Sequence, residues 1–238
     1  MTANDATRGR TRNAGLSDRN ALSFNPVDIG NLQLWYKGSD FNSFSDADRI
    51  SPLHDYSGNT GRNAIALVAV TYKTAIKNGL AILRASSSSC TISINLGSGS
   101  FTFVVAADMA NANAIQYIFD CATGRLIIAQ GVSGDQTKVG WYDGSWRSIA
   151  AATTGWQILT WVLTSGGNGE MFRNGSSLGT AAYTAKAIGG STRIFSTNGS
   201  STVTTNCDLG DFLLYNKALN ATELADIHGY LNGKWGIY

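Results

Sequence analysis

The chain has 238 residues, a formal net charge of +2 and only 14% charged residues, with 27 glycines against 2 prolines. The near-neutral charge and the lack of a lysine-rich face exclude the electrostatic signature of a nucleic-acid-binding protein. The longest apolar run, residues 64–70, is too short to cross a bilayer, so no membrane association is expected. The composition is typical of one β-rich domain whose surface is covered by uncharged polar residues.

Residues 1–30 contain few apolar side chains and no hydrophobic periodicity. They predict an extended N-terminal arm, followed by a domain over residues 31–238. No apolar segment follows the basic residues of the arm, so it is not expected to be a signal peptide. We expect the arm to lie on a neighbouring subunit or partner; an arm folded back onto its own domain is the alternative. The candidate partner-binding residues are Arg8, Arg10, Arg12 and Arg19.

Short runs of β-forming residues, separated by Gly, Asn, Asp and Ser, follow one another from residue 31 to residue 215. Residues 101–107 and 156–164 are apolar on both faces, so we expect them in the centre of a sheet. The pair Asn174-Gly175 predicts a two-residue type I′ hairpin turn. So many short strands before one terminal helix predict an all-β fold, a two-sheet antiparallel jelly-roll sandwich.

A second hairpin, around the pair Asp143-Gly144, carries the candidate binding residues. The same type of turn there is expected to place Trp141 opposite Trp146 as an aromatic pair. Flat aromatic rings beside hydrogen-bonding groups suit the stacking of sugars, and aromatic residues also anchor protein interfaces. An aromatic pair that only stabilises the hairpin or the sandwich is the alternative. The candidate contacts with a glycan or a protein are Trp141, Tyr142, Asp143, Trp146 and Arg147.

The last thirty residues predict a strand over residues 209–215 and then the one substantial helix. The side chain of Asn220 can cap this helix, and Glu223 can complete a capping box. Gly233 is expected to be the left-handed residue that ends it. The face expected to be buried is formed by Leu224, Ile227, His228 and Leu231.

No catalytic constellation is visible. Of the two glutamates, Glu223 is assigned to the helix cap and Glu170 stands alone beside a hairpin. Asp208 and Asp211 are three residues apart and are expected to face opposite sides of their strand. We therefore predict a non-enzymatic protein without a cofactor. The three cysteines lie far apart and predict buried free thiols, with no disulfide or metal site, in a protein made in a reducing cytoplasm: Cys90, Cys121 and Cys207.

Five segments carry a family resemblance in one consistent order: NLQLWYKGSD, HDYSGNTGRNA, FTFVVAA, WQILTWVLTSGGNGEMFRNGSSLG and LGDFLLYNKALNATELADIHGYLNGKWG. They resemble the concanavalin A-like lectin/glucanase superfamily, in particular its laminin-G-like jelly-roll modules from bacteria and phages. The resemblance covers residues 31–238, and the last segment is the most specific. It implies two curved antiparallel sheets that face one another.

The superfamily includes sugar binders, adhesion modules, glycosidases and structural parts of phage virions. Its glycosidases place glutamates on one strand in an E-x-D-x-E arrangement, which this chain lacks. Laminin-G-like domains often bind Ca²⁺, which makes Asp46 and Asp48 the candidate ligands. Arg49 follows them and no glycine-spaced ligand loop is visible, so we predict a polar loop without a metal.

These observations predict a structural protein of a phage virion, either a capsid decoration or a tail-associated protein. It would be made in the host cytoplasm and attached in several copies to other virion proteins through the arm of residues 1–30. The alternative is a carbohydrate-binding, lectin-like adhesin that recognises host or environmental glycans through the hairpin of Trp141 and Trp146.

Overall fold

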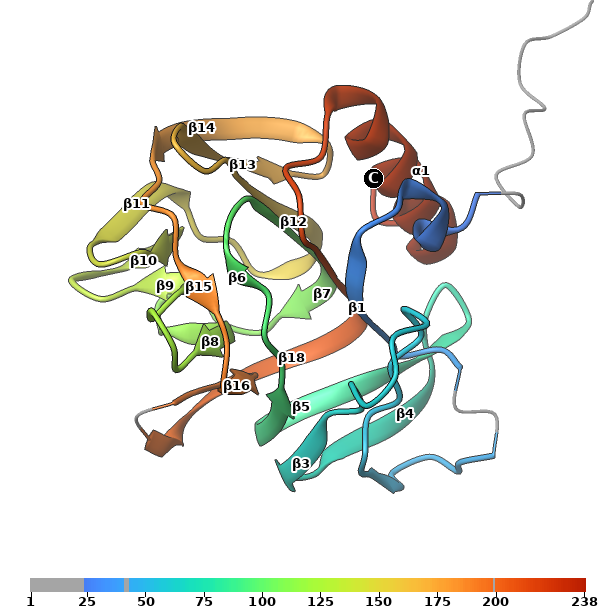
Figure 1. The fold of residues 1–238 in the computed structure, drawn as a ribbon. Coiled ribbons are helices and arrows are strands. Elements are labelled where there is room, and N and C mark those ends of the chain that lie inside the picture. Colours follow the sequence, from blue (N-terminus) through green and yellow to red (C-terminus); the bar gives the residue numbers. More distant parts are fainter. Residues whose placement is uncertain (1–23, 41–42, 199) are drawn as a thin grey trace, which may run out of the picture.

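The computed structural model describes residues 24–40, 43–198 and 200–238 (Figure 1). In this part of the chain antiparallel strands dominate, and one α-helix follows the last strand. None of its helices is long and apolar enough to span a membrane. The elements are the 3₁₀ helix η1 (Pro26–Ile29), β1 (Leu32–Lys37), β2 (Arg49–Ile50), β3 (Ile65–Val68), β4 (Val70–Lys77), β5 (Leu80–Ser93), β6 (Gly97–Ser98), β7 (Phe101–Met109), β8 (Gln116–Cys121), β9 (Ile127–Val132), β10 (Asp135–Tyr142), β11 (Trp146–Ala151), β12 (Gly155–Leu163), β13 (Asn168–Arg173), β14 (Ser176–Ala182), β15 (Ala187–Ile188), β16 (Ser191–Ile194), β17 (Ser196–Thr197), β18 (Ser200–Tyr215) and the helix α1 (Ala221–Trp235).

Apart from β6 and β15, which pair with each other, the strands form two sheets that share the long strand β5. The first sheet runs β4–β5–β18–β7–β12–β13–β14, with β1 beside the end of β18. The second sheet runs β3–β5–β16–β8–β9–β10–β11. The early half of β5 pairs with β4 and β18, and its late half pairs with β3 and β16. At the opposite side β11 and β14 lie against each other, so the sandwich nearly closes. The predicted all-β jelly-roll sandwich is confirmed.

The central strands are buried on both faces because the first sheet has a core on each side. In β7, Phe103 and Val105 point into the main core between the sheets. The alternate residues Val104 and Ala106 point to the outer face, where α1 covers them. The strand β12 alternates in the same way. This arrangement confirms the prediction that residues 101–107 and 156–164 lie in central strands.

The helix α1 begins as predicted. The side chain of Asn220 accepts the N–H groups of Thr222 and Glu223, both at 3.0 Å, and the Glu223 carboxylate accepts the N–H of Asn220 at 2.9 Å. This is a reciprocal capping box. The predicted buried face is also confirmed, and Trp235 extends it: Leu224, Ile227, His228, Leu231 and Trp235.

The predicted end of α1 was wrong. Gly233 continues the helix, and Gly236, with φ of 57°, is the left-handed residue that ends it. The extra turn brings the Trp235 indole over Gly210 of β18, where a Cβ atom would lie 2.6 Å from the ring. The contact between Trp235 and Gly210 thus stabilises an additional turn of the helix. The residues around Gly233 alone do not indicate this contact.

Two local predictions are confirmed. Asn174 and Gly175 have φ of 51° and 79°, and Arg173 lies opposite Ser176, as in a type I′ hairpin. Burial raises the pKa of the Cys90 thiol to about 12, so this cysteine is a packing residue. The described cysteines are all buried and free: Cys90, Cys121 and Cys207.

The first described residues lie against the domain. The ring of Phe24 contacts that of Tyr230 on α1 edge-on at 5.9 Å, and the Tyr215 hydroxyl donates to the carbonyl of Pro26 at 3.0 Å. The four predicted contact residues of the arm lie outside the described residues, so their role stays a prediction: Arg8, Arg10, Arg12 and Arg19.

Candidate binding face

The hairpin of β10 and β11 has a different register from the predicted one. Tyr142 lies opposite Trp146, and Trp141 lies opposite Arg147. The loop therefore contains residues 143–145 rather than a two-residue turn, and the predicted Trp141–Trp146 pair is wrong. A shift of one residue exchanges the faces of the side chains that follow.

Because of this shift, two of the predicted binding residues, Trp141 and Asp143, are buried. Trp141 is fully buried, and its indole N–H donates to Asp143 at 3.3 Å. Asp143 is 1% exposed and also accepts the N–H of Thr184 at 2.8 Å and the Nε–H of Arg147 at 3.2 Å. These contacts fix the longer loop. Trp141 and Asp143 therefore anchor the hairpin and do not face the solvent.

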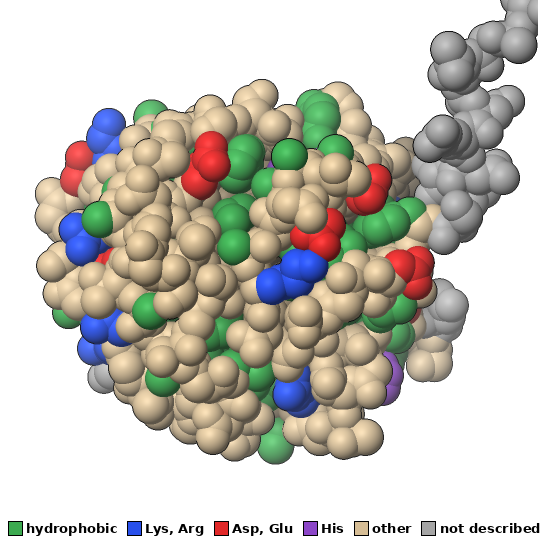
Figure 2. All heavy atoms as spheres, turned by 45° about the horizontal axis from the view of Figure 1, so that its top comes forward, with side chains coloured by type: hydrophobic (Ala, Val, Ile, Leu, Met, Phe, Trp, Pro, Cys, Tyr) green, Lys and Arg blue, Asp and Glu red, His purple; other side chains and the backbone are tan. Residues whose placement is uncertain are grey.

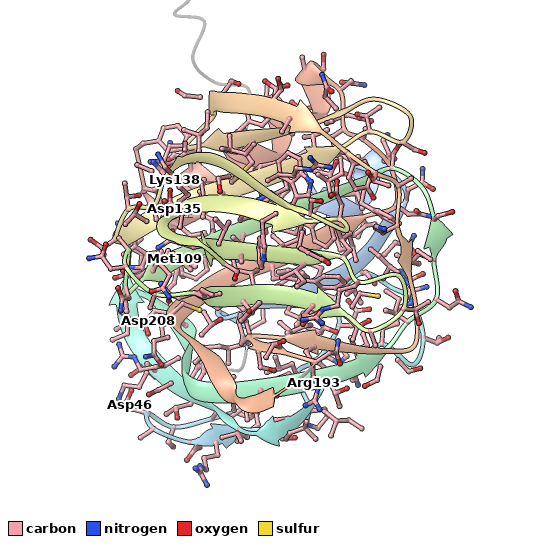
Figure 3. All side chains as sticks on the ribbon, turned by 90° about the vertical axis from the view of Figure 1, so that its left-hand side faces the viewer. Asp46, Met109, Asp135, Lys138, Arg193 and Asp208 are labelled. Carbon is pink, nitrogen blue, oxygen red and sulfur yellow. The ribbon has the colours of Figure 1, made fainter. Side chains whose placement is uncertain are left out.

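Tyr142 and Trp146 lie on the opposite, outer face of the second sheet. Their rings meet edge-on, with centroids 5.5 Å apart and an interplanar angle of 63°. Both side chains are partly exposed. Figure 3 looks onto this sheet, with Lys138 on β10 and Arg193 on β16 labelled. The hairpin thus carries a partly exposed aromatic pair, with Tyr142 in the place predicted for Trp141.

A row of directly opposed residues crosses the outer face from this aromatic pair. It continues through Ile127 on β9, Asp120 on β8, Arg193 on β16 and Thr91 on β5 to Ile65 on β3. Residues directly opposite each other in adjacent strands project from the same face. The row therefore brings positions up to 128 residues apart in the chain, Ile65 and Arg193, onto a single surface.

The middle of the row is covered by the protein itself. Asp120 is fully buried and accepts the hydroxyl of Thr197 at 2.8 Å and the N–H of Asn198 at 2.9 Å. Its second oxygen lies 3.5 Å from Nε of Arg125. The residues after β16 thus separate the outer face into an aromatic end at β10 and β11 and a second end at β3.

The second end holds a shallow cavity of about 340 Å³ lined by uncharged groups. The hydroxyls of Thr91 and Ser191 lie 3.0 Å apart there, beside Ile65, which is 61% exposed. Hydroxyl and amide groups next to an aliphatic side chain can bind the hydroxyls and the C–H face of a sugar. The sequence does not indicate this cavity, because its lining comes from segments far apart in the chain: Gly61, Asn63, Ile65, Thr91, Ile92, Ser93, Gly190 and Ser191.

Two carboxylates that are far apart in the sequence meet on the outer face of the first sheet. Asp108 on β7 lies directly opposite Asp208 on β18. Arg84 clamps Asp208 through two bonds of 2.6 Å. Burial, and then the charge of Asp208, raise the pKa of the Asp108 carboxyl. Both aspartates line a cavity of about 360 Å³.

The expectation that Asp208 and Asp211 face opposite sides was wrong. The register of β18 shifts between Leu209 and Asp211, so Gly210 is an extra residue in the strand. Both aspartates therefore face the outer side, where Asp211 accepts the indole N–H groups of Trp35 at 2.8 Å and Trp235 at 2.6 Å.

The candidate calcium ligands have protein partners. Asp46 forms an ion pair with Lys73 and accepts the N–H of Thr74 at 3.0 Å, while Asp48 accepts the N–H of Ser45 at 2.7 Å. Within the described ranges, no three His, Cys, Asp or Glu side chains gather as a metal site would require. Both aspartates hold their loop.

No protein-family model and no curated protein matches this sequence. Among solved structures, domain 4 of the GH43 extracellular arabinanase AbnA from Geobacillus stearothermophilus, in complex with arabinotriose, has 16% identity and a TM-score of 0.61, covering 83% of this chain and 98% of that one. Botulinum neurotoxin type C, whose cell entry depends on interaction with two ganglioside molecules, has 13% identity and a TM-score of 0.56, covering 86% and 52%. A Trypanosoma rangeli sialidase has 12% identity and a TM-score of 0.56, and the match covers 86% of this chain and 33% of the sialidase chain.

This chain thus spans about half the length of the neurotoxin chain and nearly all of the arabinanase domain. At such low identity the likeness shows the fold alone. The fold of this chain is an antiparallel β-sandwich of the jelly-roll type.

Proposed function

We propose that this chain is a non-catalytic carbohydrate-binding module. The observation that carries the proposal is the Tyr142–Trp146 pair, which projects from the outer face of the second sheet while buried contacts of Asp143 fix its loop. Sugars present apolar C–H faces that stack on such rings. Since the backbone beneath the pair is held rigidly, little conformational entropy would be lost on binding.

The solved structures of similar fold support this proposal. One was determined with arabinotriose bound, and another belongs to a toxin that interacts with two gangliosides. They indicate that a sandwich of this kind can present a glycan-binding surface. The site is located in this chain by the partly exposed rings of Tyr142 and Trp146. Arg147 stabilises their loop from the other face through its bond to Asp143.

A glycan array tests the proposal with the wild type, Tyr142→Ala, Trp146→Ala and a control, Phe44→Ala. Phe44 is 38% exposed, and its ring packs against Tyr72 of β4 in the first sheet, whereas β10 and β11 belong to the second sheet. We expect a wild-type signal that Trp146→Ala and Tyr142→Ala each weaken about tenfold, equivalent to ~1.4 kcal/mol. The control should bind as the wild type does. A wild type that binds no glycan, or a Trp146→Ala variant that binds unchanged, would refute it.

Glycoside hydrolysis by the carboxylate pair of Asp108 and Asp208 is the second candidate function. Glycosidases use a pair of carboxyl groups, one of which donates a proton. Burial raises the pKa of the Asp108 carboxyl, and Asp208 beside it is bound by Arg84. We propose that the pair is structural, with Asp208 tying β18 to Arg84 on β5. Incubation with polysaccharides should release no sugar. Release by the wild type that disappears in Asp108→Asn would establish the enzyme instead.

The virion role predicted from the sequence depends on residues 1–30, most of which lie outside the described residues. It stays a prediction with its own test. A chain that lacks residues 1–29 should fold but should no longer join a virus-sized particle; normal assembly of the shortened chain would contradict it.

A further inference from the structure

A groove of about 660 Å³ runs between α1 and the hairpin of β12 and β13. The helix contributes Ala221, Ala225 and Gly229, whose short side chains leave space beside it. Val162 and Phe172 form the opposite wall on the outer face of the first sheet. Figure 2 brings the top of Figure 1 forward, and hydrophobic side chains gather in the upper part of that view. The volume is in the usual range for a small-molecule site, about 300–1,000 Å³.

A buried imidazole supplies one polar atom to this groove. His228 is 5% exposed, and its Nε2 lies 2.8 Å from the Thr160 hydroxyl. Its Nδ1 lies 3.9 Å from the Cβ position of Gly175, another residue of the lining, and makes no hydrogen bond to the described residues. Burial lowers the pKa of His228 to about 4, so the ring is neutral at neutral pH. The groove thus offers a hydrogen-bonding atom without a positive charge.

Glu170 is the one charged side chain in the lining. It lies opposite Val162 across β12 and β13 and accepts the Ser177 hydroxyl at 2.6 Å. No lysine, arginine or histidine of the described residues forms an ion pair with it. The aromatic rings of Phe172 and Tyr238 line the same groove and can add cation–π attraction. A negative charge beside an apolar surface and aromatic rings favours a ligand that is both apolar and cationic.

We propose that the groove binds a small amphiphile with an alkyl or aryl body and an ammonium head group. The body lies against Val162, Phe172 and Leu224, and the ammonium pairs with the Glu170 carboxylate. An anionic head group would meet this carboxylate as a like charge, and an uncharged one would leave it without a counter-ion. The site is separate from the outer face of the second sheet, so it stands whether or not Tyr142 and Trp146 bind a glycan.

Three probes with one body and different head groups test the proposal: octylammonium, octanol and octanoate, each below its micelle concentration. Binding is followed by NMR through the backbone amides of Gly229 and Asn232. We expect octylammonium to bind about tenfold more tightly than octanol, and octanoate to bind most weakly. In Glu170→Gln, octylammonium and octanol should differ less than about twofold. Equal affinities for the three probes in the wild type, or no amide shifts with octylammonium, would overturn the proposal.

Two matched glycine variants locate the site. A Cβ atom at Gly229 or at Gly233 would have no heavy atom within 4 Å, so both positions on α1 accept a side chain. Gly229 lines the groove and Gly233 does not. Gly229→Leu should fill the groove and remove binding of all three probes, while Gly233→Leu should bind as the wild type does. Unchanged octylammonium binding by Gly229→Leu would place the site elsewhere and contradict the proposal.

Discussion

Asp211 shows how much a single residue holds together in this fold. It is fully buried, accepts the indole N–H groups of Trp35 and Trp235, and pairs with Lys234 at 2.9 Å. Asp211→Ala would leave two buried indole donors and one cation without a partner. We expect a loss of about 3–5 kcal/mol in the free energy of unfolding, measured in urea. Asp211→Asn, which keeps an acceptor, should lose less; a loss below about 1 kcal/mol for Asp211→Ala would contradict this view.

His228 makes stability depend on pH. Its pKa in the folded protein is about 4, below the unfolded value of about 6.5. Its stabilising contribution is complete above pH 6.5 and is lost as the pH falls towards 4, because the unfolded chain binds the proton first. The loss reaches about 3 kcal/mol, of which about 2 kcal/mol occurs by pH 5. Urea unfolding at pH 7 and pH 5 should show this extra loss in the wild type and not in His228→Gln; equal losses in both proteins would refute it.

At the scale of the elements, two glycines of α1 have opposite roles. Gly233 is exposed inside the helix, so Gly233→Ala should stabilise the protein by about 0.5–1 kcal/mol. Gly236 has φ of 57°, a conformation that disfavours a Cβ atom, so Gly236→Ala should destabilise it by about 1 kcal/mol. Thermal unfolding measures both changes. If Gly233 ended the helix, the signs would be reversed.

Elements governed by neighbouring residues could be predicted from the sequence. The capping box of Asn220 and the turn at Asn174-Gly175 need only residues within three positions of each other. The hairpin at Asp143 was mispredicted because its carboxylate also accepts the N–H of Thr184, 41 residues away. Likewise, the extra residue Gly210 lies under a ring from the end of α1. Tertiary contacts of this kind leave no local pattern.

In the candidate binding face, too, the residues close in sequence could be predicted, and those brought together by the fold could not. Tyr142 and Trp146 were named from the sequence, because an aromatic hairpin is a local motif. The hydroxyls of Thr91 and Ser191 were not, since the two residues are 100 positions apart in the chain. The jelly roll makes neighbours of β5 and β16 through a crossover that no spacing reveals.

For the whole molecule, residues 24–30 belong to the stable unit. A chain that begins at Asn31 loses the contact of Phe24 with Tyr230 and leaves the buried Tyr215 hydroxyl without the Pro26 carbonyl. Compared with a chain that begins at Phe24, it should be less stable by about 1–3 kcal/mol. Urea unfolding of the two chains checks this. Equal midpoints would show that residues 24–30 contribute nothing.

The position of β18 has a consequence for biosynthesis. This strand lies between β7 on one side and β1 with β5 on the other, yet it is made after all of them. Until residues 200–215 have left the ribosome, these apolar strands lack their partner and expose sheet edges that can associate with other chains. A chain interrupted before residue 200 is therefore expected to aggregate.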